Sequence, residues 1–160
     1  MLDELLAEIA RRKAERKGQL QPPCPPERIQ RLRRRCLEHL KANLPEDYAS
    51  LLGHTDGVDW NGTVFYASET STIVGYSDRF IEGFVEANLS YRDIPRCERL
   101  LVFGESGMEF YAFALDKLQY QVTDQISLDA LEVYPSFEEL FQAAYAKRLW
   151  PKGMRDKTAD

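Results

Sequence analysis

The segment over residues 43–66 constrains the fold more than any other, because it carries start and stop signals for a helix followed by a hairpin turn. Pro45 suits the first turn of a helix, where its missing N–H breaks no hydrogen bond, and the two acids after it favour the positive end of the helix. Gly57 can adopt the left-handed backbone that ends a helix. Asn61-Gly62 favours a tight turn between antiparallel strands. The segment therefore predicts a short helix over 45–54 and then a hairpin.

Two longer helices are predicted before this segment. Apolar residues recur at helical spacing over residues 2–17, up to Gly18, and again over residues 27–44. Between them, four prolines within eight residues cannot continue a helix and favour an extended connector. We therefore divide the chain into an N-terminal amphipathic helix, a proline-rich connector, one main domain and a charged tail, over residues 1–18, 19–26, 27–150 and 151–160.

After the short helix, the apolar residues follow the period of strands. Branched and aromatic residues mark six strand candidates, over residues 63–67, 71–75, 99–103, 108–115, 118–123 and 131–134. Helical spacing returns over residues 78–90, where Asp78 can cap the start, and Ser136 with Glu139 has the capping-box spacing that opens a last helix ending before Pro151. The pattern predicts an α+β fold: N-terminal helices, a mostly antiparallel twisted sheet with a crossover helix, and a C-terminal helix packed on the sheet.

The distribution of charge points to a protein partner. The net charge is −5, but residues 1–43 hold 11 basic and 6 acidic residues, whereas residues 44–143 hold 5 basic and 18 acidic residues. An acidic central block fits a basic protein surface and not a nucleic acid. The predicted second helix carries an arginine-rich face, formed by Arg28, Arg31, Arg34 and Arg35. No aromatic residue interleaves with these arginines to stack on bases, so we interpret the face as solvated.

Composition indicates a cytoplasmic protein without cofactors. No apolar stretch reaches the roughly 20 residues needed to cross a bilayer, and the first ten residues form an acidic amphipathic pattern rather than a secretion signal. Cys24, Cys36 and Cys97 lie far apart with no Cys-x-x-Cys pair, which predicts reduced structural thiols. No histidine lies near them at the spacing of a metal site, so we expect no metal.

No complete set of catalytic residues is evident. His39 and His54 fit structural positions on helices, and Gly104-Glu-Ser-Gly107 lacks the lysine and length of a phosphate loop, so we expect a hairpin turn there. Paired carboxylates support acid–base chemistry only when they face each other across a pocket. We therefore expect a non-enzymatic protein, with a small hydrolase as a third alternative that would use acid pairs such as Asp56 and Asp59, Glu105 and Glu109, or Glu138 and Glu139.

The order of these features resembles the SUKH superfamily of Smi/Knr-like domains, over roughly residues 26–149. The matching pieces are, in chain order, Leu44-Pro45, Tyr48, Gly57, Asn61-Gly62, Phe65-Tyr66, the segment 102–107 and Ser136-Phe137. The family usually has asparagine before the glycine that follows the helix, and Asp56 stands there in this chain. Aspartate still tolerates the turn, so the implied fold is unaffected.

This resemblance implies an interaction role, since bacterial members are typically immunity proteins that neutralise a toxin and eukaryotic members look like regulatory scaffolds. We expect an immunity-type monomer or weak homodimer that binds a cognate toxin or other basic protein, with a regulatory scaffold of the same fold as the alternative. We expect no membrane or nucleic-acid contact. Acids would steer the partner and aromatic residues would anchor it, although core packing is the alternative for the aromatic ones. The candidate partner-binding residues are Asp56, Asp59, Trp60, Tyr66, Glu69, Glu105, Glu109 and Tyr111.

Overall fold

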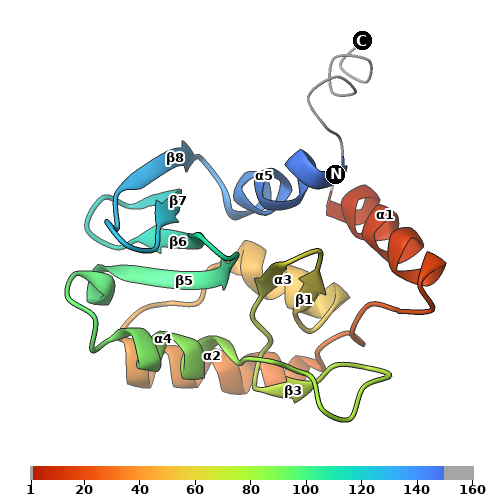
Figure 1. Cartoon of the computed structure of the whole chain (residues 1–160). Helices are drawn as coiled ribbons and strands as arrows, with labels where there is room; N and C mark the ends of the chain where they lie inside the picture. The colour runs from red at the N-terminus through yellow and green to blue at the C-terminus, as the bar shows by residue number, and fades with distance from the viewer. Residues whose placement is uncertain (1, 150–160) are drawn as a thin grey trace.

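A computed structural model describes residues 2–149, which form an α+β fold (Figure 1). The main sheet is antiparallel and six-stranded, in the order β1-β2-β5-β6-β7-β8, and β3 and β4 pair separately. The helices are α1 (Leu2–Glu15), α2 (Pro26–Leu40), α3 (Glu46–His54), α4 (Phe84–Tyr91) and α5 (Phe137–Leu149). The strands are β1 (Val58–Trp60), β2 (Thr63–Phe65), β3 (Ser71–Thr72), β4 (Phe80–Ile81), β5 (Leu100–Glu105), β6 (Glu109–Ala114), β7 (Gln119–Asp124) and β8 (Ala130–Tyr134). The predicted fold class is confirmed.

Helices α4 and α5 cover opposite faces of the sheet (Figure 1). On β6, the Phe110 ring contacts Tyr91 of α4, with 4.9 Å between ring centroids. The neighbouring Tyr111 stacks on Phe65, which in turn meets Phe141 of α5. Because adjacent strand residues point to opposite faces, these contacts place one helix on each side.

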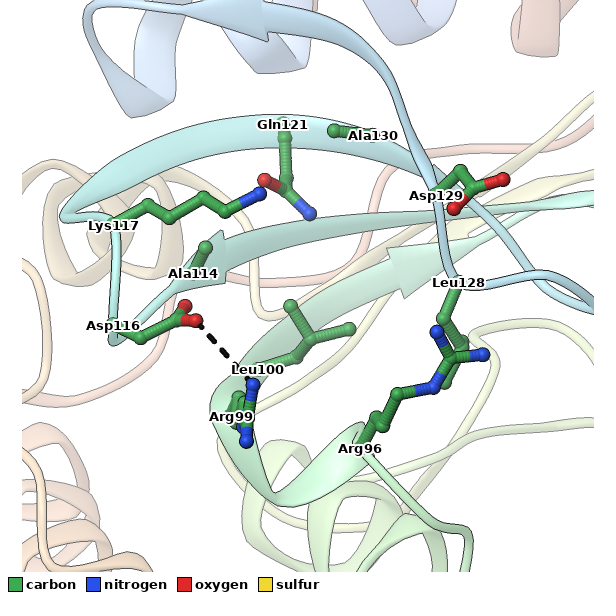
Figure 2. A pocket seen from close by; sticks show the side chains of 10 residues that line it. All are labelled: Arg96, Arg99, Leu100, Ala114, Asp116, Lys117, Gln121, Leu128, Asp129 and Ala130. Atoms are coloured by element: carbon green, nitrogen blue, oxygen red, sulfur yellow. Dashed lines mark ion pairs between the residues drawn. The ribbon is translucent and has the colours of Figure 1, made fainter.

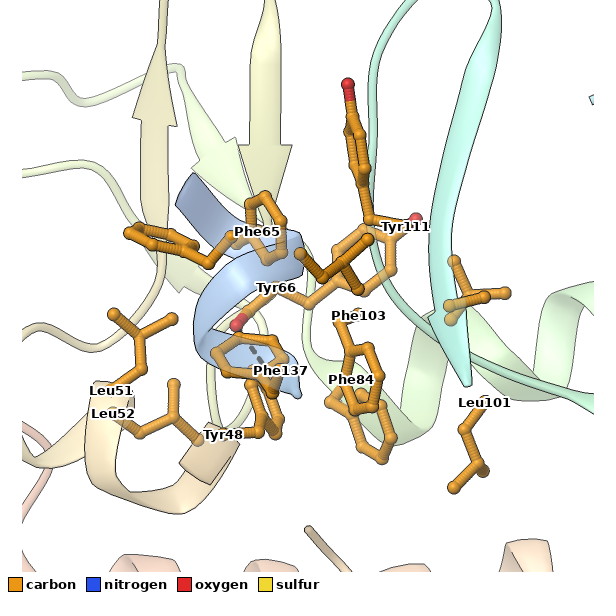
Figure 3. Packing of buried hydrophobic residues seen from close by; sticks show 14 of the residues in the cluster. Tyr48, Leu51, Leu52, Phe65, Tyr66, Phe84, Leu101, Phe103, Tyr111 and Phe137 are labelled. Atoms are coloured by element: carbon orange, nitrogen blue, oxygen red, sulfur yellow. Dashed lines mark hydrogen bonds between the residues drawn. The ribbon is translucent and has the colours of Figure 1, made fainter. Parts of the chain in front are cut away.

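Aromatic rings fill the core between the sheet and α3 and α5 (Figure 3). Tyr48 of α3 lies within 5.5 Å, centroid to centroid, of Phe84, Phe103 and Phe137. Its hydroxyl donates to the Tyr66 carbonyl oxygen at 2.6 Å, so the one polar atom of this buried ring is satisfied. The three cysteines are free and buried, as predicted. No helix over residues 2–149 is long and apolar enough to cross a membrane.

Two helix boundaries differ from the prediction. Helix α2 ends at Leu40 rather than near residue 44, because Lys41 takes a left-handed backbone with φ of 57° and bonds back to Leu37. The helix expected over 78–90 begins only at Phe84, with Gly83 rather than Asp78 at its cap position. The helical spacing of Phe80 misled the prediction, since residues 80–81 form β4 and pair with β3. The expected tail over 151–160 and the helix stop before Pro151 lie outside the described residues.

The turn glycines act in three different ways. Asn61 and Gly62 both have positive φ, 54° and 81°, and join β1 to β2 in the predicted tight turn. Helix α3 instead ends before Thr55, whose backbone is extended. Gly57, two residues later and with φ of 89°, directs the chain into β1. Gly104 lies within β5 beside a bulge, not in the predicted hairpin turn. A Cβ at Gly104 would stand 2.4 Å from the Val64 carbonyl oxygen, so β2 and β5 need glycine there.

Candidate functional site

The structure separates the eight residues that sequence analysis assigned to a partner. Three are buried: Asp56, Tyr66 and Tyr111. Two partly exposed acids are engaged by arginines: Asp59 and Glu69. Three others are partly exposed: Trp60, Glu105 and Glu109. The expected single acidic and aromatic surface is therefore not formed by all eight side chains together.

Asp56 links three segments of the fold. Its carboxylate accepts hydrogen bonds from the Ser68 backbone N–H at 2.7 Å and from the Ser68 hydroxyl at 3.0 Å. Arg28 of α2 reaches the same carboxylate at 3.2 Å. With 5% of Asp56 exposed, these bonds satisfy its charge inside the protein. Asp56 thus has a structural role in this chain.

Tyr66 and Tyr111 belong to the core rather than to a contact surface (Figure 3). The Tyr66 hydroxyl lies 2.7 Å from the Tyr91 hydroxyl, and Tyr91 donates to Glu105 at 2.9 Å. Because Tyr91 has one hydroxyl proton and gives it to Glu105, Tyr66 must donate to Tyr91. Burial raises the pKa of Tyr66, as does its bond to Tyr91, so the chain of hydroxyls stays protonated.

The arginine-rich face of α2 is partly solvated, as predicted, since Arg31 and Arg34 are exposed, but three of its four arginines also pair with acids. Arg28 and Arg31 lie 3.3 and 3.7 Å from the Glu69 carboxylate, and Arg35 lies 2.7 Å from that of Glu86. Of the four arginines named from sequence, Arg34 is exposed and makes no ion pair with residues 2–149. The first positive segment of the chain therefore neutralises acids of the central block, because α2 packs beside α4.

A group of three carboxylates remains at the start of α4 and the end of β5, and we term Glu82, Glu86 and Glu105 the acidic patch. Partial burial raises the pKa of Glu82, and the negative charges of Glu105 and Glu86 raise it further. Within the described chain, Glu82 and Glu105 make no ion pair, and the buried Oε2 atom of Glu86 has no hydrogen-bond partner. The patch is thus a place where negative charge is concentrated and incompletely offset.

Sequence analysis named only Glu105 of this patch. Glu82 and Glu86 both fall inside the predicted helix over 78–90. Their spacing of four residues would have placed the two carboxylates side by side on that helix. Their approach to Glu105 depends on the packing of α4 against β5, which no local pattern reveals. Tyr91 was missed for the same reason, although it joins the patch to the core.

Glu105 and Glu109 do not act as a pair. Glu105 is opposite Phe110 in the β5–β6 register, and Glu109 is opposite Asp124 in the β6–β7 register. Since Glu109 and Phe110 are neighbours on one strand, the two glutamates face opposite sides of the sheet. Glu109 instead lines a cavity of about 100 Å³ beneath α5. Trp60 packs on Tyr145 of α5, with ring centroids 6.0 Å apart.

Histidines and possible metal ligands are the other groups to consider in the described part of the chain. His54 lies 3.7 Å from Asp3, consistent with a position at a helix end. No group of three or more potential metal ligands is found among residues 2–149. What the acidic patch offers chemically is attraction for a cation, through carboxylates held by a helix start and a strand end. In comparisons with known proteins, no model of a protein family matches the chain and no curated protein matches its sequence.

Proposed function

We propose that this chain is a protein-binding module of the SUKH type, and that it acts as an immunity protein that neutralises a cationic toxin. The observation that carries the proposal is the acidic patch, because two of its carboxylates lack an ion pair in the described structure. The charge segregation supports it as well, since the arginines of α2 pair with other central acids and, within the patch, with Glu86, and they leave Glu82 and Glu105 without an ion pair in the described structure.

Electrostatics favour a basic side chain at the patch. Partial desolvation raises the pKa of Glu82, and repulsion from Glu105 and Glu86 raises it further. A guanidinium or ammonium group placed between Glu82 and Glu105 would relieve this repulsion. Charge pairs of this kind steer association and orient the partner. Glu105 is also held by Tyr91, so it is oriented before binding.

The experiment begins with affinity capture from the native cells at low and moderate salt, followed by calorimetry with the purified partner. We expect a basic protein whose Kd rises about tenfold or more in the Glu82→Gln/Glu105→Gln double variant. Glu38→Gln is the matched control, because Glu38 is an exposed acid on α2 without an ion pair in the described chain, and it should change Kd less than about twofold. Equal affinity of the double variant and the control would refute the role of the patch.

The immunity role has its own test. Production of the captured partner alone should arrest growth, and co-production with this chain should restore it. The Glu82→Gln/Glu105→Gln variant should restore growth less well than the Glu38→Gln variant. A captured partner that has no effect on growth would favour the regulatory scaffold over the immunity role. The calorimetry would still decide whether the patch binds that partner.

A further inference from the structure

A pocket of about 210 Å³ opens at the end of the sheet where β5 begins (Figure 2). Three connections meet there: the segment before β5, the β6–β7 turn and the β7–β8 loop. Leu100 and Ala114 form an apolar part of its lining. The pocket is therefore built from segments distant in sequence rather than from a single loop.

Basic side chains outnumber acidic ones around this pocket by three to two. Arg96, Arg99 and Lys117 line it, against Asp116 and Asp129. Asp116 is 3.9 Å from Arg99, a long ion pair that leaves most of the guanidinium's N–H groups available. Lys117 is exposed and makes no ion pair within residues 2–149. A locally positive pocket stands out in a chain of net charge −5.

A buried amide adds a neutral donor to the pocket. Gln121 is 4% exposed, and its Nε2 atom donates to the Thr123 hydroxyl at 2.8 Å. An amide nitrogen has two hydrogens, so the second remains for an occupant. Gln119 donates to the Gln121 oxygen at 3.1 Å, which fixes the amide orientation. The floor thus presents an N–H group below the basic rim.

The backbone around the pocket is held in an uncommon conformation. Arg96, Leu118 and Leu128 have φ of 73°, 53° and 60°, and one lies in each of the three connections. Left-handed backbone is disfavoured for residues other than glycine, and such conformations gather at ligand sites. Arg96 donates to the Ser127 carbonyl oxygen at 2.8 Å, so two of the connections are tied together.

We propose that this pocket binds a small anion carrying a phosphate or carboxylate group. Arginine forks and a lysine ammonium are the side chains that recognise such groups. The volume of about 210 Å³ is below the 300–1,000 Å³ typical of pockets for drug-sized ligands, so the occupant is small. Figure 2 shows Lys117 and Gln121 along one side of the pocket and Arg96 and Arg99 along the other.

The test uses the full chain with inorganic phosphate and malonate as probes and sodium chloride at matched ionic strength as the reference. At an anion concentration about ten times its Kd, binding should raise Tm by about 2–5 °C above the chloride reference. Two-dimensional NMR should show saturable shifts for the Gln121 side-chain amide and the Lys117 backbone amide. Phosphate binding alone assigns a phosphoryl ligand, and malonate binding alone assigns a carboxylate ligand.

Variants decide whether the effect belongs to this pocket. Lys117→Gln and Arg99→Gln should each weaken binding about tenfold, the value of one charge-assisted hydrogen bond. Arg16→Gln is the control, because Arg16 is exposed at the end of α1 and makes no ion pair within residues 2–149. Lys117 is exposed, so its variant should fold normally. Equal shifts for phosphate, malonate and chloride, or binding unchanged in both pocket variants, would overturn the proposal.

Discussion

Asp56→Ala tests whether Asp56 holds the fold together rather than contacting a partner. The change removes the acceptor for the Ser68 N–H at 2.7 Å and for the Ser68 hydroxyl at 3.0 Å. Leaving buried donors without an acceptor costs about 1–3 kcal/mol. Arg28 is partly exposed and retains Glu69 at 3.3 Å, so loss of its pair with Asp56 adds only about 0–1 kcal/mol. We expect a loss of about 1–4 kcal/mol in the free energy of unfolding.

Urea unfolding followed by far-ultraviolet circular dichroism measures this loss. Asp56→Asn keeps an oxygen for the Ser68 N–H, so it should cost about 1 kcal/mol. Asp93→Ala is the control, because Asp93 is an exposed acid without an ion pair in the described chain, and it should stay within about 0.5 kcal/mol of the parent. The reasoning fails if Asp56→Ala unfolds like Asp93→Ala, or if the asparagine variant is as unstable as the alanine variant.

Three further predictions concern glycine, pH and thiols. Gly104→Ala should cost about 2 kcal/mol or more in chemical unfolding, because its Cβ would stand 2.4 Å from a carbonyl oxygen, whereas Gly107→Ala meets nothing within 4 Å and should be tolerated. The pKa of Glu82 is raised in the folded state, so binding a proton at Glu82 stabilises the folded protein. This contribution is complete below about pH 4.5 and is lost as the pH rises through the raised pKa. Thermal unfolding should therefore show Glu82→Gln stabilising the protein more at pH 7 than at pH 4. A thiol reagent at pH 8 should modify the folded protein slowly and the urea-unfolded protein fully, since burial raises the pKa values of Cys24, Cys36 and Cys97.

Local signals predicted most elements because the physics that forms them is local. The Asn61-Gly62 turn needs only two residues with positive φ, and both have it. The Ser136 hydroxyl accepts from the Glu139 N–H at 3.2 Å, as the capping spacing predicted. The start of α4 was wrong because Phe80 and Ile81 pair with residues 71–72, a contact that helical spacing does not encode. Pairing between distant segments overrode a local pattern.

The candidate site was harder to predict, because it depends on which side of each element is covered. Asp56 follows a helix in an acidic stretch, as an exposed acid would, yet Ser68 and Arg28 enclose it. Tyr66 alternates with its neighbours on a strand, and sequence alone left open which face was buried. The approach of Glu82 to Glu105 arises from helix-on-sheet packing. Residue type indicated the chemistry available, and tertiary packing decided which residues present it.

The segregation of charge along the chain has two consequences that differ in range. At short range, basic residues of α2 meet acids of the central block, with Arg33 held 2.6 Å from Glu46 and Arg35 held 2.7 Å from Glu86. These ion pairs reduce the negative charge that is available to attract a partner. The number of acids in the sequence therefore overstates that attraction. At longer range, attraction concentrates where the arginines of α2 do not reach, and Glu82 and Glu105 lie there without an ion pair in the described chain. The same charge pattern that aligns α2 with α4 therefore also selects the place where we propose that a cationic partner binds.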